Sequence, residues 1–224
     1  MKRSEINRNL VLTKEFFEKM NVQLPKWAYW TPDDWKSSTN DLTEIKNNGL
    51  GWDITDFGSG DFEKIGLINF NPRNGSLENS DKPYCEKIIL VKESQITPLH
   101  THIDKKEDII NRGGGNLVIE LRNGDLEANT NDLDVVVRID GIPVTVEAGG
   151  LVVLEPGESI YLLPSTYHAF WGEKGSGSVL VGEVSTVNDD SKDNIFLDSN
   201  PRFPVIDEDE PPLHFLVNDY KAFL

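Results

Sequence analysis

Three of the four histidines in this chain stand in a pattern that is suited to binding a metal. His100 and His102 are two residues apart, so on a β-strand both imidazoles point to the same face. Glu107 follows after a four-residue turn that can bring its carboxylate to the same point, and His168 supplies a third imidazole. Imidazoles with one carboxylate form a mixed nitrogen and oxygen site for a divalent first-row metal such as Mn, Fe, Co, Ni or Zn. Such a metal can act as a Lewis acid.

Short apolar runs separated by turn residues must position these side chains. From Gly51 onward such runs alternate with Gly, Asn, Asp and Pro, and Asp140-Gly141 between two β-branched runs is a strong hairpin signal. We expect strands at residues 52–57, 64–70, 84–92, 117–122, 135–139, 144–147, 151–154, 159–163, 168–171 and 178–185. About ten short strands with regular turns favour an all-β sandwich or barrel over βαβ units. The glycine triplet at residues 113–115 is expected to form a turn rather than a phosphate loop.

The two ends of the chain differ from this β-rich middle. Apolar residues recur at helical spacing from Ser4 to Asn21. Thr31, followed by Pro32 and two acids, is typical of the start of a short second helix. Near the other end we expect the acidic run at residues 207–210 to be solvated. The short run at residues 214–217 is expected to dock on the β-rich part or on a second subunit.

The composition narrows the classes of partner. The formal charge is −16, and a surface this acidic repels phosphate backbones and anionic lipid, so we expect neither nucleic acid nor a membrane as partner. A neutral small molecule or a cation suits this charge better. The single cysteine, Cys85, excludes an internal disulfide and a Cys-rich zinc site. Apolar runs of signal-peptide or membrane-span length are missing, which predicts a soluble cytoplasmic protein.

The histidine patterns resemble those of a known superfamily. The spacing His100-x-His102-x4-Glu107-x6-Gly114 resembles the first motif of the cupins, and the stretch from Pro156 to His168 resembles the second. The second motif departs from the usual pattern, because Pro164 lies four rather than five residues before His168. All four ligand positions are nevertheless filled.

The whole chain resembles one cupin family, the D-lyxose isomerases. The resemblance runs through residues 2–7, Trp30-Thr31-Pro32, the segment from His100 to Gly115 and the segment from Gly182 to Asn194. It implies a cupin-type β-barrel (jelly roll) with an N-terminal helical extension. We therefore expect the helical extension at residues 1–50, the catalytic barrel at 51–205 and a tail at 206–224.

The resemblance also implies a site, an activity and an assembly. A divalent metal, usually manganese, is expected to be held by three histidines and one glutamate: His100, His102, His168 and Glu107. The family interconverts D-lyxose with D-xylulose, often also D-mannose with D-fructose, and forms homodimers.

Aldose–ketose isomerisation moves a proton between C1 and C2, generally through an enediolate, and requires a base and an acid besides the Lewis acid. Lys105 lies between two candidate ligands, so its ammonium can sit beside a developing oxyanion, although it can equally be an exposed turn lysine. Glu183 alternates with apolar residues on one face of a predicted strand. If that face lines the barrel, Glu183 is the proton-shuttling base; if it faces solvent, it is an ordinary strand acid.

Four further residues are candidates for binding the sugar. Lys87 is a charged residue within an apolar strand, and Asp190 and Asp193 follow the last predicted strand, where they bind hydroxyls or simply solvate the loop. Trp171, three residues after His168, either stacks on a sugar face or packs in the core.

Three rival functions remain open at this stage. A cupin dioxygenase would use a similar metal site with iron and would consume oxygen. A sugar-phosphate isomerase would need a basic phosphate cradle, for which Arg112 beside the glycine triplet is thin support. A non-enzymatic sugar-binding cupin would keep the barrel without the base.

Overall fold

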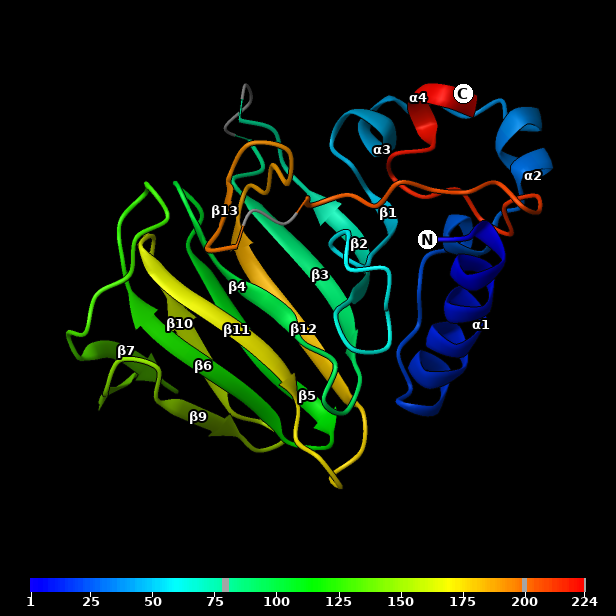
Figure 1. The fold of residues 1–224 in the computed structure, drawn as a ribbon. Helices are drawn as coiled ribbons and strands as arrows, with labels where there is room; N and C mark the ends of the chain where they lie inside the picture. Colours follow the sequence, from blue (N-terminus) through cyan, green and yellow to red (C-terminus); the bar gives the residue numbers. More distant parts are fainter. Residues whose placement is uncertain (78–80, 199–200, 224) are drawn as a thin grey trace.

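The computed structural model describes residues 1–77, 81–198 and 201–223, and is built on two antiparallel sheets (Figure 1). The eight-stranded sheet has, in spatial order, β1 (Gly51–Thr55), β2 (Leu67–Asn74), β3 (Tyr84–Val91), β12 (Val179–Thr186), β5 (Glu107–Gly114), β10 (Ser159–Leu162), β7 (Val135–Ile139) and β8 (Ile142–Val146). The five-stranded sheet has β13 (Asn194–Phe196), β4 (Thr97–His102), β11 (Thr166–Gly172), β6 (Leu117–Asn123) and β9 (Leu151–Leu154). Within the described residues, no helix is long and apolar enough to cross a membrane.

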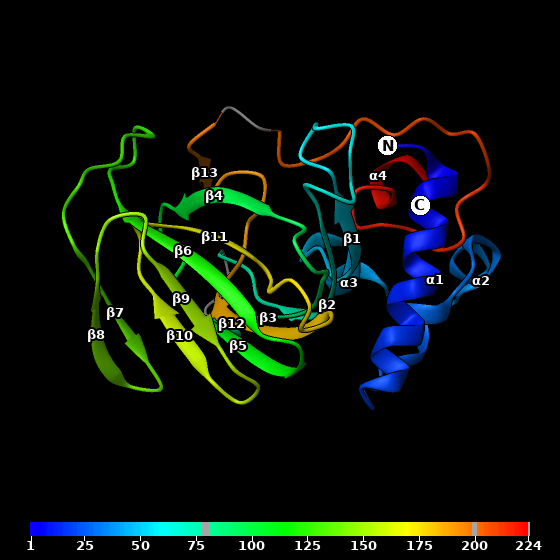
Figure 2. The ribbon, with the colours of Figure 1, turned by 60° about the horizontal axis from the view of Figure 1, so that its bottom comes forward.

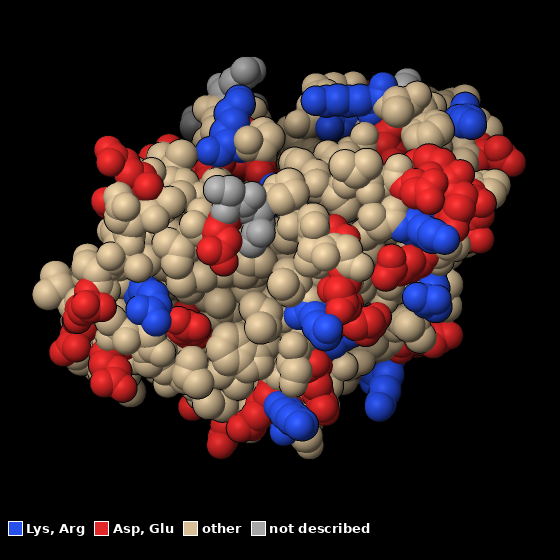
Figure 3. All heavy atoms as spheres, in the orientation of Figure 1, with Lys and Arg blue, Asp and Glu red and all other residues tan. Residues whose placement is uncertain are grey.

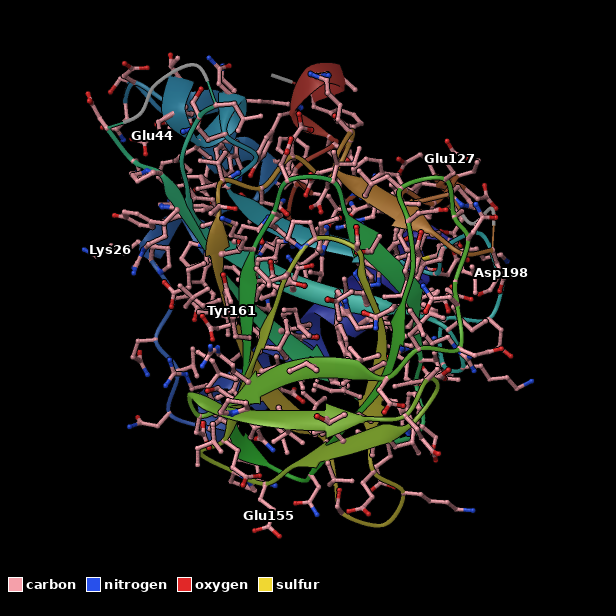
Figure 4. The ribbon with its side chains drawn as sticks, turned by 90° about the vertical axis from the view of Figure 1, so that its left-hand side faces the viewer. Lys26, Glu44, Glu127, Glu155, Tyr161 and Asp198 are labelled. Carbon is pink, nitrogen blue, oxygen red and sulfur yellow. The ribbon has the colours of Figure 1, made fainter. Side chains whose placement is uncertain are left out.

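The two sheets face each other, as Figure 2 shows from a second direction, and apolar side chains from both sheets form a core between them. Side chains alternate between the two faces of each strand, so β6 sends Ile119 and Leu121 into this core while β12 sends Val179 and Val181. Seen from the side of β7 to β9 in Figure 4, side chains fill the space between the sheets, and exposed acids lie at the rim. The labelled acids there are Glu44, Glu127, Glu155 and Asp198. The prediction of an all-β, cupin-type barrel with an N-terminal helical extension is confirmed.

The helical extension covers the outer face of one part of the larger sheet. It contains α1 (Arg3–Lys19), a short 3-10 helix (Lys26–Tyr29), α2 (Pro32–Ser37) and α3 (Thr43–Asn47). The apolar stripe of α1, formed by Ile6, Leu10 and Phe17, packs in a second core with residues of β1 and β2 such as Trp52 and Phe70. Each such buried side chain stabilises the fold by roughly 1.5–3 kcal/mol. Strands β1 and β2 are therefore buried on both faces.

The start of α2 follows the sequence prediction. Thr31 caps the helix, with its Oγ1 accepting a hydrogen bond from the amide of Asp34 at 3.3 Å. The Asp34 carboxylate accepts one in return from the Thr31 amide at 2.8 Å, which closes a capping box. These bonds satisfy backbone donors that would otherwise lack partners at the start of the helix.

The C-terminal tail packs on the helical extension. Its last turn forms α4 (Tyr220–Phe223), which lies beside α3 in Figure 1. The acidic run at residues 207–210 is exposed, and Figure 3 shows acids gathered on this side of the molecule. The run is not merely solvated, however, because Glu208 pairs with Arg3 and Asp209 accepts a hydrogen bond from Ser4. These acids lie at the N-terminus of α1, where the helix dipole favours negative charge. The division of the chain into three units stays a prediction.

The segment around β5 differs from the sequence prediction. Residues 107–114 form a strand, and the first two glycines of the triplet belong to its end rather than to a turn. Gly113 and Gly114 have positive φ angles of 143° and 92° beside a bulge in the pairing with β12. A Cβ on Gly114 would lie 2.2 Å from the carbonyl oxygen of Ser178. The glycines thus allow the close approach of β12. The predicted hairpin at Asp140-Gly141 is confirmed, with positive φ at both residues.

Candidate active site

Two adjacent strands of the smaller sheet bring the three histidines together. In the antiparallel pair of β4 and β11, His100 lies directly opposite His168, and His102 follows two residues along on the same face. The candidate ligand nitrogens of the three imidazoles all lie within 4.8 Å of one another, and all three side chains are buried.

The backbone orients two of these imidazoles. His100 Nδ1 is 2.8 Å from the carbonyl oxygen of Pro98, and His168 Nδ1 is 3.2 Å from that of Thr166. A ring that donates from Nδ1 presents a lone pair on Nε2, which is the usual arrangement of a metal-binding histidine. Burial, with the neighbouring imidazoles, holds the pKa of His100 well below its usual range, so this ring is neutral as a ligand must be.

Glu107 completes the set from the opposite sheet. It is the first residue of β5, and its Oε1 lies 3.2 Å from His102 Nε2 and 3.0 Å from His168 Nε2. These three buried atoms have no hydrogen-bond partner among the described residues. Burial alone would raise the pKa of Glu107, yet Lys105 and His102 outweigh it and hold this pKa well below the usual range. Three unpartnered ligand atoms that converge on one point fit a divalent cation.

A row of alternating charges leads away from the histidines. Lys105 Nζ lies 2.8 Å from Glu107 Oε2 and 2.9 Å from Glu183 Oε1. Lys87 Nζ lies 3.4 Å from Glu183 Oε1 and 3.5 Å from Asp190 Oδ1. Burial by itself would lower the pKa of both lysines, but the adjacent carboxylates raise each above its ordinary value, so both carry charge.

The row continues through Asp190 to Arg202. Arg202 Nη2 donates to Asp190 Oδ2 at 3.1 Å and also to Asp53 of β1. Burial would raise the pKa of Asp190, yet Arg202 and Lys87 hold it well below its usual range. We name the six residues Glu107, Lys105, Glu183, Lys87, Asp190 and Arg202 the charged row.

The histidines and the charged row line one small pocket inside the barrel, together with apolar side chains. Phe196 of β13 stacks on His100 with ring centroids 5.4 Å apart, and Phe57 and Phe170 also line the pocket. Enclosed polar groups beside aromatic walls suit a small polar molecule with some apolar faces.

Most of the residues predicted for the site lie in this pocket. The structure brings together the four candidate ligands and the candidates Lys105, Glu183, Lys87 and Asp190. Of the two orientations considered for Glu183, toward the barrel or toward solvent, the structure has the first: Glu183 is buried and faces inward on β12. Lys105 is buried rather than exposed.

Two predicted substrate contacts lie elsewhere. Trp171 is on the face of β11 opposite to His168 and is outside the pocket lining, because side chains alternate along a strand, and Phe170 takes the inward position. Asp193 lies behind a candidate ligand, with Oδ2 3.4 Å from His102 Nδ1 and Oδ1 accepting from the amide of Asp104 at 2.8 Å. This placement suits orientation of the imidazole more than contact with a sugar.

Three further residues in or beside the pocket are not predicted from the sequence: Arg202, Asn188 and Phe196. Asn188 Oδ1 accepts a hydrogen bond from Lys87 Nζ at 3.0 Å. These residues stand in connecting segments or in the three-residue strand β13, where no periodic pattern marks a side chain as inward-facing. Only the neighbourhood of Asp190 in the sequence hinted at this part of the site.

The arrangement of sheets is shared with solved sugar isomerases. The L-ribose isomerase of Cellulomonas parahominis, solved with L-ribose, superposes with a TM-score of 0.61 over 92% of this chain and 98% of its own, at 14% identity. The Acinetobacter sp. DL28 L-ribose isomerase in complex with L-ribose gives 0.59 over 89% and 93%, at 12% identity. Identities this low show the fold alone, and the class that this fold and the histidine pocket define is that of the cupin-type barrels.

The family follows from the sequence comparisons. The family model described as D-lyxose isomerase matches residues 1–220, and this chain belongs to that family. A D-lyxose/D-mannose isomerase of Serratia proteamaculans is 47% identical over 227 residues, and one of Escherichia coli O157:H7 is 49% identical over 226, each match covering 100% of both chains. The protein is therefore an enzyme of the sugar isomerase class. The dioxygenase and the non-enzymatic binding protein no longer compete with this assignment.

Proposed function

We propose that this chain interconverts D-lyxose with D-xylulose, and D-mannose with D-fructose, by moving a proton between C1 and C2. The observation that carries the proposal is the position of Glu183. Its carboxylate is joined through one ammonium, that of Lys105, to Glu107 beside the histidine cluster. A base and a cation thus stand next to a place where a sugar carbonyl can be polarised. The two relatives named above are both D-lyxose/D-mannose isomerases.

His100, His102, Glu107 and His168 would hold the divalent metal, which we propose to be manganese, and the metal supplies Lewis acidity to the sugar oxygens when bound. Glu183 takes the proton from C2 of the aldose and returns it to C1, while the proton of the C2 hydroxyl passes to the oxygen on C1, which forms the ketose. Lys105 Nζ donates a hydrogen bond to the oxygen on which negative charge develops during the transfer. Phe196 and Phe170 keep water from the reacting carbons.

The charges in the pocket support a neutral substrate. Each of the three pocket cations Lys87, Lys105 and Arg202 already contacts two carboxylates of the protein. A phosphate group would have to compete with these carboxylates for the same cations. We therefore expect D-mannose 6-phosphate to be a poor substrate compared with D-mannose.

The decisive experiment is an isomerisation assay on metal-stripped protein, with D-lyxose and D-mannose, before and after Mn²⁺ is added. We expect ketose only with metal, and its loss in His100→Ala. The matched control is Trp171→Phe, since Trp171 lies three residues after His168 on the same strand but outside the pocket lining. Lack of ketose from both sugars, with metal bound to the wild-type protein, would overturn the proposal.

The route of the hydrogen can be tested separately. When the reaction runs in D₂O, proton transfer through Glu183 introduces solvent deuterium at C1 of the ketose, which NMR detects. Complete retention of hydrogen together with unchanged turnover in Glu183→Gln would instead indicate a hydride shift and would remove Glu183 from its proposed role.

We also propose, from the family resemblance, that the enzyme is a homodimer and acts in the cytoplasm. Light scattering with size-exclusion chromatography tests the first point, with twice the chain mass of 25.2 kDa as the expected result. Fractionation of cells that produce the protein tests the second.

A further inference from the structure

Arg202 is held firmly on one side and has a free donor on the other. Nη2 donates both to Asp53 and to Asp190, and the guanidinium lies 5.0 Å from the ring centre of Phe203. The side chain is only 9% exposed. Nη1 is buried as well, yet it has no hydrogen-bond partner among the described residues. A buried, charged donor without a partner is rare in proteins and requires an explanation.

The position of Arg202 in the pocket explains why its Nη1 has no partner within the described part of the protein. Arg202 lines the same pocket as His100 and His168. In the charged row it is the last member, and the contacts that join it to Glu107 pass through Asp190, Lys87, Glu183 and Lys105 in turn. The free Nη1 thus belongs to the end of the row opposite the histidines.

The chemistry of the partner follows from the donor. A guanidinium nitrogen can only donate, so its partner must be an acceptor oxygen or nitrogen. The positive charge of Arg202 is already balanced by Asp53 and Asp190, which favours a neutral acceptor over an anion. A hydroxyl oxygen of a sugar chain is such an acceptor.

We propose that Arg202 Nη1 donates a hydrogen bond to a hydroxyl oxygen of the open-chain sugar, at a carbon beyond C1 and C2. This inference rests on the proposed function, which places C1 and C2 beside Glu183. Arg202 is then a substrate-binding residue that distinguishes sugars by a distal hydroxyl. Asp53 is a positioning residue, because it reaches the guanidinium from β1 but lies outside the pocket lining.

The first test compares Arg202→Met with the wild type. Loss of one hydrogen bond from a charged donor predicts that KM for D-lyxose and D-mannose rises about tenfold to a hundredfold, with a smaller fall in kcat. The matched control is Arg73→Met, which removes an arginine that pairs with Glu86 at the surface, and we expect it to leave KM unchanged. An unchanged KM in Arg202→Met would overturn the inference.

The second test finds the hydroxyl. We would measure KM for 4-deoxy-, 5-deoxy- and 6-deoxy-D-mannose with both proteins. In the wild type one deoxygenation raises KM, and in Arg202→Met the same deoxygenation has no further effect, because its hydrogen bond is already gone. Equal penalties in both proteins for all three sugars, and for 3-deoxy-D-mannose as well, would contradict a contact with Arg202.

A conservative variant keeps the inference falsifiable if Arg202→Met fails to fold. Arg202→Lys retains a positive charge for Asp53 and Asp190 but lacks the second nitrogen. Calorimetry with D-mannitol, which has the sugar's hydroxyls but no carbonyl, is expected to show binding about tenfold weaker than that of the wild type. Equal binding would overturn the inference. Failure of the wild type to turn over either sugar would instead overturn the proposed function.

Discussion

Within the part of the chain that the structure describes, Arg3 and Arg202 are each buried against a pair of carboxylates, and they differ in what their nitrogens contact. Arg3 joins α1 to the tail: Nε and Nη2 donate to Glu208 at 2.8 and 2.6 Å, while Nη1 and Nη2 donate to Asp219 at 3.0 Å each. All three of its nitrogens therefore have partners. Arg202 in the pocket uses Nη2 for both of its carboxylates and leaves Nη1 without one.

This difference separates a structural ion pair from a binding site. A buried polar atom without a partner destabilises a protein by about 1–3 kcal/mol. In a pocket, a bound ligand can provide the missing partner for such an atom. The same feature recurs in the pocket at Glu107 Oε1 and at Nε2 of His102 and His168. Among the described residues, several buried polar atoms in the pocket thus lack hydrogen-bond partners. At the contact of Arg3 with Glu208 and Asp219, which we call the junction, every guanidinium nitrogen has a partner.

The largest expected effect comes from the pocket. Glu183→Gln removes the proposed base but keeps the size of the side chain, so we expect kcat to fall by about 10²–10⁴. We also expect the free energy of unfolding to fall by about 2 kcal/mol, since the buried Lys87 and Lys105 each lose one of their two carboxylates. The control is Glu86→Gln, on the adjacent strand β3 and paired with Arg73 at the surface. Steady-state kinetics and calorimetry check both values, and an unchanged kcat would show that Glu183 is not the base.

At the junction we expect a substitution to lower stability and to leave catalysis unchanged. Arg3→Met leaves the buried carboxylate of Asp219 without its cation, which should lower the free energy of unfolding by about 3–5 kcal/mol. The folded fraction should keep its kcat, because Glu208 and Asp219, the side-chain partners of Arg3, do not line the pocket. Urea unfolding measures the change, with the exposed Arg8→Met on the same helix as control. A large loss of kcat at unchanged stability would contradict a purely structural role for Arg3.

The pH dependence of stability in Asp190→Asn tests the ion pairs of the pocket. Asp190→Asn should lower the free energy of unfolding by about 2 kcal/mol at pH 7, less than at the junction, since Arg202 and Lys87 each keep a second carboxylate. Because the pKa of folded Asp190 lies well below its ordinary value of 3.8, its stabilisation is complete above pH 4 to 5 and is lost as the pH falls further.

The difference in the free energy of unfolding between the wild type and Asp190→Asn should therefore become smaller below about pH 4. Unfolding curves at several pH values measure it. The exposed Asp132→Asn serves as control, and we expect it to follow the wild type at every pH. A difference that grows toward low pH would contradict the assigned direction.

The smallest expected effect concerns the cap of α2. Thr31→Ala removes the hydroxyl that accepts from the amide of Asp34, so we expect a loss of about 1 kcal/mol in stability. Thr31→Ser keeps the hydroxyl and should restore most of it. Thermal unfolding compares the two, and activity should stay unchanged in both.

Much of this site could be predicted because it lies on strands. The period of two placed His100 and His102 on one common face and Glu183 on the same face as Val179 and Val181. Residue type singled out Glu107 and His168 as further ligands. The same rule separates Trp171 from the neighbouring Phe170, which points the other way. Lys87 was found because a lysine within an apolar strand is conspicuous.

Arg202 could not be predicted, since it reaches the pocket from a segment without periodic structure. Its partners show this, because Asp53 lies 149 residues earlier in the sequence. Strand β5 was missed because its glycines are typical of turns, and their role depends on how closely β12 approaches. Such features depend on contacts between distant parts of the chain, and local patterns do not report them.

The junction between α1 and the tail has a consequence for the order in which the molecule is made. Arg3 and Asp219 are 216 residues apart, so the first helix leaves the ribosome long before its carboxylates do. Until then the guanidinium lacks both carboxylates, while the apolar stripe of α1 can already pack against core residues of β1, β2, β3 and β12. Closure of this junction is accordingly a late event, because it joins α1 to a segment 216 residues further along the chain.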